Sequence, residues 1–202
     1  MTVNFLPLVL SAGAGYLIGS LSFSILLSRS QYKDDIRNYG SGNAGMTNML
    51  RTFGKWAAVV VFAGDFLKGL AAVLLGGAIG GEAGALLAGF FAVVGHVFPL
   101  YFHFRGGKGV ATSAGVILGL HPLVLLVLGS VFLLVLFLSR IVSLSSICAA
   151  VSYPITALLL RLPRPELLLS VVLAALVIWL HRANIGRLMR GEEHRFGVKK
   201  KD

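Results

Sequence analysis

The sequence predicts an all-α integral membrane protein that crosses the bilayer several times. Of its 202 residues, 56% are hydrophobic and only 13% are charged, and the mean hydropathy is +0.86. A soluble domain is about 25% charged, so a chain of this composition folded in water would expose a large apolar surface. Apolar runs separated by short basic loops support the same prediction. Residues 1–202 are expected to form a single membrane-embedded domain.

The apolar runs give six full spans and one short span. A helix needs about 20 apolar residues to cross the bilayer core. The first run lacks the basic start of a cleavable signal peptide and is too long for one, so it is expected to be a first span. The expected spans cover residues 3–27, 56–79, 82–104, 109–120, 122–139, 141–160 and 166–180, of which 109–120 is the short one.

The distribution of basic residues predicts the topology. Lys and Arg gather in cytoplasmic loops. With seven crossings and an external N-terminus, 15 of the 18 basic residues lie on one side. With six crossings, Arg140 and the basic tail would move to the other side and the bias would disappear. We therefore expect seven transmembrane helices, the N-terminus outside and the C-terminus in the cytoplasm. The net charge of +10 is then explained by topology and by anionic lipids or phosphorylated substrates, and nucleic acid is not an expected partner.

A first polar cluster lies in the stretch 28–55. Gly40, Gly42 and Gly45 permit tight turns and close approach of the main chain to a ligand. Small hydrogen-bonding side chains and one arginine accompany them: Ser41, Asn43, Thr47, Asn48 and Arg51. Amides in such a loop can bind an anion, and a guanidinium can hold phosphate. A glycine-rich turn that caps the next helix explains the pattern equally well.

A second cluster contains His96 and the loop 105–109, which reads Arg-Gly-Gly-Lys-Gly. It is not a Walker A motif, because Phe102 and Gly109 stand where that motif needs Gly and Ser or Thr. Amides around Lys108 could still bind phosphate, aided by the helix that follows. Arg105 and Lys108 could instead be topological anchors, but Gly106, Gly107 and Gly109 favour binding. His96 could act in catalysis or could simply be hydrogen-bonded to a neighbouring helix.

A third cluster lies where the last span meets water. His181 and Asn184 are three residues apart and share one face of a helix. A basic helix that anchors the C-terminus at the interface is the alternative interpretation. Ser146 begins another span on the same side, where hydroxyls commonly bond to their own helix. All three clusters are expected on the cytoplasmic side.

Two charged residues, Asp65 and Lys68, lie within a span. Charges inside the membrane are costly and suggest a function. The two can pair with each other, and a structural pair that orients helices is about as probable as a direct role in catalysis. No histidine has an aspartate five residues later, acidic residues do not cluster with histidines, and Gly-x-Ser-x-Gly is absent. The sequence therefore predicts no metal site and no hydrolase nucleophile. The single cysteine, Cys148, excludes an internal disulfide.

The three clusters together resemble a known family. Ser-Gly-Asn-Ala-Gly-Met-Thr-Asn (41–48), Gly-His-Val-Phe-Pro (95–99) with Phe-Arg-Gly-Gly-Lys-Gly-Val-Ala-Thr (104–112), and His-Arg-Ala-Asn-Ile-Gly-Arg-Leu (181–188) with Gly-Glu-Glu-His-Arg (191–195) are similar to the three motifs of the bacterial acyl-phosphate glycerol-3-phosphate acyltransferases. The resemblance extends over nearly the whole chain. Asp65 to Gly69 also resembles the family, whereas Arg105 stands where lysine is commoner.

The resemblance implies seven transmembrane helices in the inner membrane and an active site on the cytoplasmic side. It implies transfer of an acyl group from acyl phosphate to the 1-hydroxyl of glycerol 3-phosphate, without a cofactor. Ser41, Arg51 and Lys108 would hold phosphate, the glycines 106, 107 and 109 would form part of the glycerol 3-phosphate site, and His96, Ser146 and Asn184 would complete the pocket. The remaining expected binding residues are Gly42, Asn43, Gly45, Thr47, Asn48 and His181. Either His96 or an oxygen of the acyl phosphate would take the hydroxyl proton.

Two other functions use the same features. A transporter of a phosphorylated small molecule would also need a basic, glycine-rich site, but carriers bind near the bilayer midplane and these clusters gather at one face. A lipid phosphatase is a third interpretation, which lacks supporting histidine and arginine spacing. The sequence does not indicate acyl-chain preference or oligomeric state.

Overall fold

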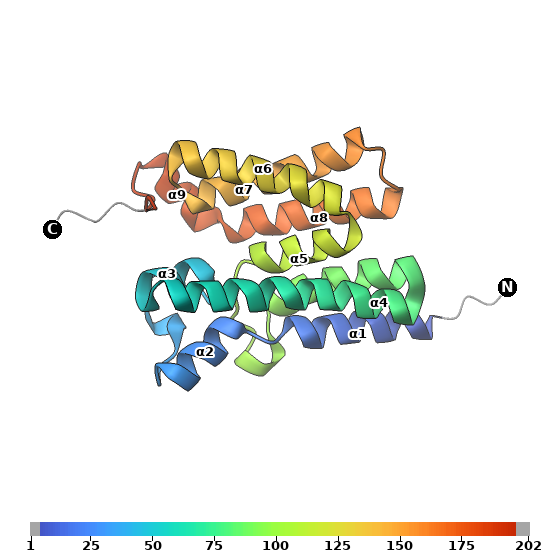
Figure 1. Cartoon of the computed structure of the whole chain (residues 1–202), viewed down its shortest axis with the longest axis horizontal. Helices are drawn as coiled ribbons and strands as arrows, with labels where there is room; N and C mark the ends of the chain where they lie inside the picture. Colours follow the sequence, from blue (N-terminus) through green and yellow to red (C-terminus); the bar gives the residue numbers. More distant parts are fainter. Residues whose placement is uncertain (1–4, 197–202) are drawn as a thin grey trace. The chain divides into compact units, whose positions relative to one another are not determined.

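The computed structural model describes residues 5–196, and its regular elements in that range are helices (Figure 1). The chain divides into two compact units, Met1–Pro122 and Leu123–Asp202, and each unit is described by itself. The single domain expected over residues 1–202 stays a prediction. The first residues of the first expected span and the last three lysines of the basic tail lie outside the described residues.

The first expected span is interrupted. Helix α1 (Leu6–Gly19) ends before three residues without helical structure, and α2 (Phe23–Gln31) follows. At this break the carbonyl oxygen of Leu21 accepts a hydrogen bond from Lys68 Nζ at 2.6 Å. A break of this kind frees main-chain groups that a continuous helix would bond internally. The sequence pattern predicted one helix over 3–27 because both halves are apolar.

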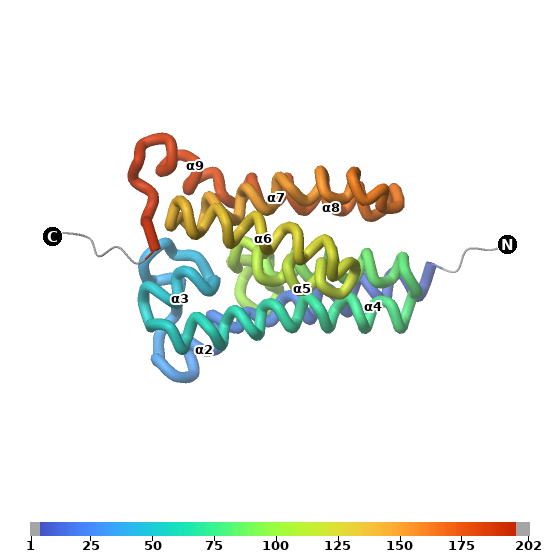
Figure 2. The backbone as a smooth tube through the Cα atoms, turned by 45° about the horizontal axis from the view of Figure 1, so that its top comes forward, coloured from blue at the N-terminus to red at the C-terminus, as the bar shows by residue number. Residues whose placement is uncertain are grey.

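Helix α4 (Lys55–Val97) contains the second and third expected spans. It leaves helical geometry at Gly80 and Gly81, where Gly81 has φ +64°, a value that favours glycine. Its 43 residues correspond to about 65 Å of helix, roughly twice the thickness of the bilayer core. The two halves fold back on each other, because a Cβ at Gly76 would lie 2.3 Å from Cβ of Ala88. Figure 2 shows the chain reversing direction within α4.

Small residues bring the helices of the first unit into close contact. A Cβ at Gly15 of α1 would lie 2.2 Å from the carbonyl oxygen of Ala88, and one at Gly19 would lie 2.1 Å from that of Ala92. Both pairs are spaced by four residues, as in helix contacts that membrane proteins make through small side chains. Helix α5 (Val110–Leu120) packs against the first half of α4 in the same way, through Gly115. Its 11 residues confirm the short apolar helix expected there.

The third expected span ends earlier than predicted. The helix stops at Val97 rather than at 104, and a short 3-10 turn, η2 (Leu100–Phe102), follows. Pro99 explains the difference, because proline lacks an amide hydrogen and disfavours helical geometry in the residue before it. The chain therefore turns back beside the end of α4.

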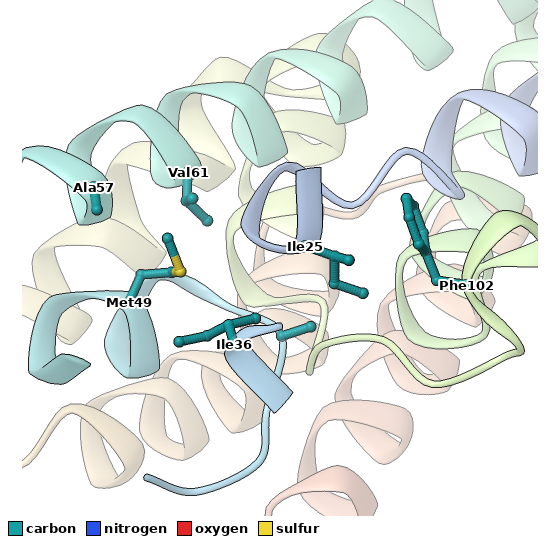
Figure 3. Close-up of a cluster of buried hydrophobic side chains, with 7 residues drawn as sticks. Ile25, Ile36, Met49, Ala57, Val61 and Phe102 are labelled. Atoms are coloured by element: carbon teal, nitrogen blue, oxygen red, sulfur yellow. The ribbon is translucent and has the colours of Figure 1, made fainter. Parts of the chain in front are cut away.

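The polar stretch 28–55 folds over a small apolar core. It contains a 3-10 turn, η1 (Ile36–Asn38), and the short helix α3 (Met46–Phe53). Figure 3 shows side chains from five elements directed toward one another: Ile25, Ile36, Met49, Ala57, Val61 and Phe102. All of them are at most 8% exposed. This core fixes the position of the first glycine-rich loop.

The second unit consists of three apolar helices and a short terminal helix. These are α6 (Pro122–Ser139), α7 (Val142–Leu159), α8 (Arg164–Leu180) and α9 (Arg182–Met189). Helices α8 and α9 meet at a bend of 59°.

The helices are long and apolar enough for a membrane protein. Among the described residues, four segments could cross a bilayer: Leu6–Gln31, Lys55–Phe102, Pro122–Ser139 and Val142–Leu159. The bent pair α8 and α9 makes a fifth, and Val110–Leu120 is a shorter apolar helix. The predicted all-helical fold is confirmed for the described residues.

Candidate active site

The first glycine-rich loop is held by Asn48. Its Oδ1 accepts a hydrogen bond from the amide of Ser41 at 3.1 Å, and its Nδ2 donates to the carbonyl oxygens of Ile36 and Tyr39 at 3.2 and 2.9 Å. Asn48 is 2% exposed. The structure thus gives Asn48 an architectural role, whereas its predicted contact with phosphate stays a prediction. Ser41 and Gly42 are exposed at the surface of this loop.

The second glycine-rich loop is bonded to the end of α4. The amide of Gly106 donates to the carbonyl oxygen of Val97, and the amide of Gly107 donates to that of His96, both at 3.1 Å. These bonds satisfy carbonyls that the last turn of a helix leaves without partners. A Cβ at Gly106 would lie 2.0 Å from the carbonyl oxygen of His96. Only a glycine allows the main chain to approach the helix this closely.

Gly107 brings the two loops and His96 together. A Cβ at Gly107 would lie 2.2 Å from Nε2 of His96 and 2.5 Å from the carbonyl oxygen of Ala44, which belongs to the first loop. The first motif, the second motif and the buried imidazole therefore meet at one point within the first unit. The resemblance implied that these features share one pocket, but residue types alone did not predict this main-chain contact.

Helix α5 begins directly after the second loop. Gly109 has φ +79° and precedes Val110, the first helical residue, and the half-buried Lys108 precedes Gly109. The hydroxyls of Thr112 and Ser113 in the first turn are buried without a hydrogen-bond partner among residues 5–196. Thr112 ends the second motif, but the sequence predicted no role for it. Buried unpaired hydroxyls beside a glycine-rich loop were not evident from the sequence.

Arg37 joins the loop after α2 to the loop after η2. Its Nη1 donates to the carbonyl oxygens of Phe102 and Arg105 at 2.9 and 3.2 Å, and its Nε donates to Asp35 at 2.9 Å. Arg29 also pairs with Asp35, at 2.8 Å. Hydrogen bonds from Arg37 hold the pKa of Asp35 well below its usual value. Sequence reasoning counted both arginines only as topological charges.

A buried polar group of three residues links the two halves of α4. Lys68 Nζ lies 2.7 Å from Asp65 Oδ1 and 3.0 Å from His96 Nδ1, and His96 Nδ1 lies 3.4 Å from Asp65 Oδ1. All three residues are at most 4% exposed. Asp65 precedes Gly80 by fifteen residues and His96 follows Gly81 by fifteen. The reversal of α4 therefore places them at the same level, about 22 Å from the turn. The predicted pairing of Asp65 with Lys68 is present, and His96 joins it.

In the second unit, Glu193 collects three hydrogen bonds. It accepts from Asn184 Nδ2 at 2.7 Å, from Arg187 Nε at 2.7 Å and from Ser143 Oγ at 3.0 Å. Burial raises the pKa of the Glu193 carboxyl, but the hydrogen bonds from Asn184, Arg187 and Ser143 together hold it below its ordinary value. Glu193 was part of a quoted motif but was not selected as a site residue. It fixes the orientation of the Asn184 amide.

His181 lies at the α8–α9 bend and Asn184 in α9, and both are buried, at 3% and 7% exposure. His181 Nδ1 lies 2.7 Å from the carbonyl oxygen of Val177. Ser146 Oγ donates to the carbonyl oxygen of Val142 in its own helix, which is the bond commonly made by such hydroxyls.

The predicted site residues thus fall into two groups. The first unit contains both glycine-rich loops, His96 and the pair Asp65 and Lys68, with Arg51 exposed in the last turn of α3 and Thr47 half-buried in its first. The second unit contains Ser146, His181 and Asn184. Within residues 5–196, no three His, Cys, Asp or Glu side chains are grouped so as to hold a metal ion.

Comparison with known proteins relates this arrangement to one family. The family described as Glycerol-3-phosphate acyltransferase matches residues 9–191. A glycerol-3-phosphate acyltransferase of Pseudomonas syringae pv. tomato is 49% identical over 191 residues, which cover 93% of this chain and 97% of the relative. One of Thermoanaerobacter pseudethanolicus is 44% identical, with 95% and 96% covered.

Two solved structures have the same fold. Both are described as PlsY (YgiH), an integral membrane glycerol 3-phosphate acyltransferase, one in a glycerol 3-phosphate form and one in a lysophosphatidic acid form. Their TM-scores are 0.89 and 0.85 at 39% and 38% identity, and each comparison covers 94% of this chain and 95% of the other. The predicted family is confirmed: this membrane protein belongs to the glycerol-3-phosphate acyltransferases.

Proposed function

We propose that the protein transfers a fatty acyl group from acyl phosphate to the 1-hydroxyl of sn-glycerol 3-phosphate. The products are 1-acyl-glycerol 3-phosphate (lysophosphatidic acid) and phosphate, and the reaction is the first acylation of phospholipid synthesis. Membership of the family and the similarity to structures described as glycerol 3-phosphate and lysophosphatidic acid forms support this reaction. The donor is proposed from the motif resemblance.

The observation that carries the proposal is the meeting of the two glycine-rich loops at His96. A Cβ at Gly107 would touch both the imidazole and the first loop, so main-chain groups of both loops approach one point. Glycine-rich loops with nearby cations are suited to phosphate, and both substrates carry phosphate. Lys108 and Arg51 would supply positive charge, and Ser41 would supply a hydroxyl.

The proposed chemistry needs little covalent participation by the protein. Acyl phosphate is already activated, so attack by the 1-hydroxyl at the carbonyl carbon forms the ester, the C–O bond to phosphate breaks, and the hydroxyl proton passes to an oxygen of the departing phosphate. The protein would stabilise charge on the carbonyl oxygen and on the departing phosphate. In the first unit, Lys108 would do this, and the roles predicted for Ser146 and Asn184 in the second unit stay predictions.

We also propose seven crossings, with the N-terminus outside and the active site on the cytoplasmic side of the inner membrane. The reversal of α4 at Gly80 and Gly81 supports counting it as two spans. Counting α5 as a short span then gives seven, and this count places 15 of the 18 basic residues on one side. Single cysteines introduced just before and just after α4 are expected to be accessible from the cytoplasmic side, and one at the turn at Gly80 and Gly81 from the outside.

The test of the reaction uses purified protein in lipid with labelled glycerol 3-phosphate. Palmitoyl phosphate, palmitoyl-CoA and palmitoyl carrier protein are supplied in separate reactions. Labelled lysophosphatidic acid is expected only with palmitoyl phosphate. Product from a thioester would retain an acyltransferase but contradict the proposed donor, and no product from folded protein would contradict the enzyme.

The transporter interpretation has a separate test. Sealed proteoliposomes without any acyl donor are given labelled glycerol 3-phosphate. We expect no uptake beyond that of protein-free vesicles. Saturable uptake would favour a carrier over an enzyme.

A further inference from the structure

The buried pair Asp65 and Lys68 has a geometry that determines the state of His96. Lys68 Nζ donates to the carbonyl oxygen of Leu21 at 2.6 Å and faces His96 Nδ1 at 3.0 Å. Asp65 Oδ1 supplies the counter-charge at 2.7 Å. The cluster therefore surrounds the amino group of Lys68 with groups that can accept a proton or a hydrogen bond.

An ammonium group has three N–H donors and no acceptor. A ring nitrogen that contacts it at hydrogen-bond distance must therefore offer a lone pair rather than a hydrogen. Nδ1 of His96 is nearer to Lys68 Nζ, at 3.0 Å, than to Asp65 Oδ1, at 3.4 Å. A hydrogen on Nδ1 would point at the ammonium. The proton of a neutral His96 consequently resides on Nε2.

Nε2 faces the second glycine-rich loop. A Cβ at Gly107 would lie 2.2 Å from Nε2, so only a glycine lets the main chain of the loop approach this ring nitrogen. Nδ1 is directed into the helices and Nε2 toward the loop for which phosphate binding is proposed. The two ring nitrogens therefore contact different partners: Nδ1 contacts Lys68, and Nε2 lies against the loop.

We infer that Lys68, with its counter-ion Asp65, fixes His96 as the tautomer protonated on Nε2, so that His96 donates a hydrogen bond to an anionic oxygen of a bound substrate. His96 is then a donor, not the base that accepts the hydroxyl proton. Lys68 and Asp65 are positioning residues that act through His96. This inference rests on the proposed function for the identity of the substrate, but the tautomer itself does not.

The cost of this arrangement supports a functional purpose. Two charged groups inside a membrane span are expensive, and an apolar pair would hold the helices together without that cost. The link also joins elements that are distant in sequence, since Leu21 follows α1 and Lys68 and His96 belong to opposite halves of α4.

The first measurement needs no variant. The protein is labelled with ¹⁵N-histidine, and the protonated ring nitrogen is identified by NMR in detergent or lipid, with His96→Gln to assign the signal. We expect His96 to be neutral with hydrogen on Nε2. His181 serves as an internal reference, because its Nδ1 contacts a main-chain carbonyl at 2.7 Å and must carry the hydrogen. Hydrogen on Nδ1 of His96 would overturn the inference whether or not the protein is active.

The second measurement is a double-mutant cycle. Asp65→Asn and Lys68→Met are introduced together, because removing one charge alone would leave the other buried without its partner. We expect kcat/KM to fall about 100-fold, as when one donor to a developing anion is removed, and His96 to lose its preference for Nε2. The same change in a His96→Ala background should cost little more than His96→Ala alone.

Three outcomes would overturn the inference in the folded variants. They are an unchanged tautomer of His96 in the paired variant, an unchanged kcat/KM in that variant, and losses in kcat/KM from the paired change and from His96→Ala that simply multiply when combined. A merely structural pair would lower the melting temperature but leave the two effects on activity independent. If palmitoyl phosphate gives no lysophosphatidic acid while His96 carries its hydrogen on Nε2, the proposed reaction is contradicted and the tautomer is not.

Discussion

Two buried histidines in this molecule are held in opposite ways. His96, in the first unit, contacts a lysine 28 residues away, whereas His181, in the second, contacts the carbonyl oxygen of Val177 one helical turn earlier. The first contact requires hydrogen on Nε2 and the second requires it on Nδ1. The two rings are almost equally buried, at 4% and 3% exposure. Burial alone therefore does not indicate what a histidine does.

The origin of each contact explains the difference. His181 bonds within its own helix, at the bend between α8 and α9, as polar side chains at helix ends often do. His96 instead depends on the reversal of α4, which brings two membrane charges to its level. Its other nitrogen faces a glycine-rich loop. A contact that combines distant elements with costly buried charges favours function over local structure.

A large effect that sharpens this contrast is expected at Lys108, in the loop that His96 faces. Replacing it by methionine removes a charge proposed to hold phosphate, which is worth about 1.5–3 kcal/mol. We expect kcat/KM to fall about 10- to 100-fold. Arg105→Met is the matched control, because Arg105 is exposed in the same loop and should change kcat/KM less than about threefold. Equal losses in the two variants would contradict a specific contact between Lys108 and phosphate and would indicate a general electrostatic effect of positive charge in the loop.

A smaller effect is expected in the second unit, on the side of His181 and Asn184. Glu193→Gln removes a carboxylate that accepts three hydrogen bonds, so Asn184 loses its fixed orientation. We expect about a tenfold fall in activity. Glu192→Gln is the control, because Glu192 is 56% exposed and pairs with the exposed Arg190 at the surface. If the two variants behave alike, the tail has no positioning role.

Asn48→Asp tests the support of the first loop. The substitution keeps the size of the side chain but removes the two hydrogen bonds that Nδ2 donates to Ile36 and Tyr39. We expect a loss of stability of about 1–3 kcal/mol and faster amide hydrogen exchange over residues 36–41. Unchanged exchange in that segment would contradict the architectural role of Asn48.

The smallest effect concerns Asp35, and it depends on pH. Arg37 holds the pKa of Asp35 below its usual value, so the folded state gains stability from the ionised carboxylate. This gain is complete above the ordinary aspartate pKa of about 3.9 and is lost as the pH falls through the lower pKa of the folded state. Asp35→Asn should therefore lower Tm at pH 6, and the difference should fade below about pH 4. A difference that is constant with pH would contradict this origin.

Much of the architecture followed from the sequence. The apolar runs predicted the helices, and Gly80 and Gly81 separated two spans that form a single element, α4. The break after α1 was not predictable from hydropathy, because apolar residues flank it on both sides. The structure shows that the break exposes the carbonyl oxygen of Leu21, which accepts a hydrogen bond from Lys68. The early end of α4 could have been predicted from Pro99, which lies within the expected span 82–104.

The resemblance grouped the parts of the site in one pocket, but the contacts between them did not follow from the sequence. The motifs named His96, Gly107 and the first loop, yet their meeting depends on a main-chain approach that residue types do not encode. Arg37 was missed because a basic residue in a loop is first explained by topology, and Glu193 was missed because its three contacts arise only in the fold. The unpaired buried hydroxyls of Thr112 and Ser113 were visible only from packing.

The most direct test of the account is the activity of Gly107→Ala compared with Gly13→Ala. A Cβ at Gly107 would lie 2.2 Å from His96 Nε2 and 2.5 Å from the carbonyl oxygen of Ala44, whereas one at Gly13 would meet no atom within 4 Å. Both variants are assayed with palmitoyl phosphate and glycerol 3-phosphate after equal folding has been verified. The account predicts a loss of about 100-fold for Gly107→Ala, as for a displacement of about 1 Å in a catalytic site, and little change for Gly13→Ala. Equal activity of the two variants would contradict a site built where the loops meet His96.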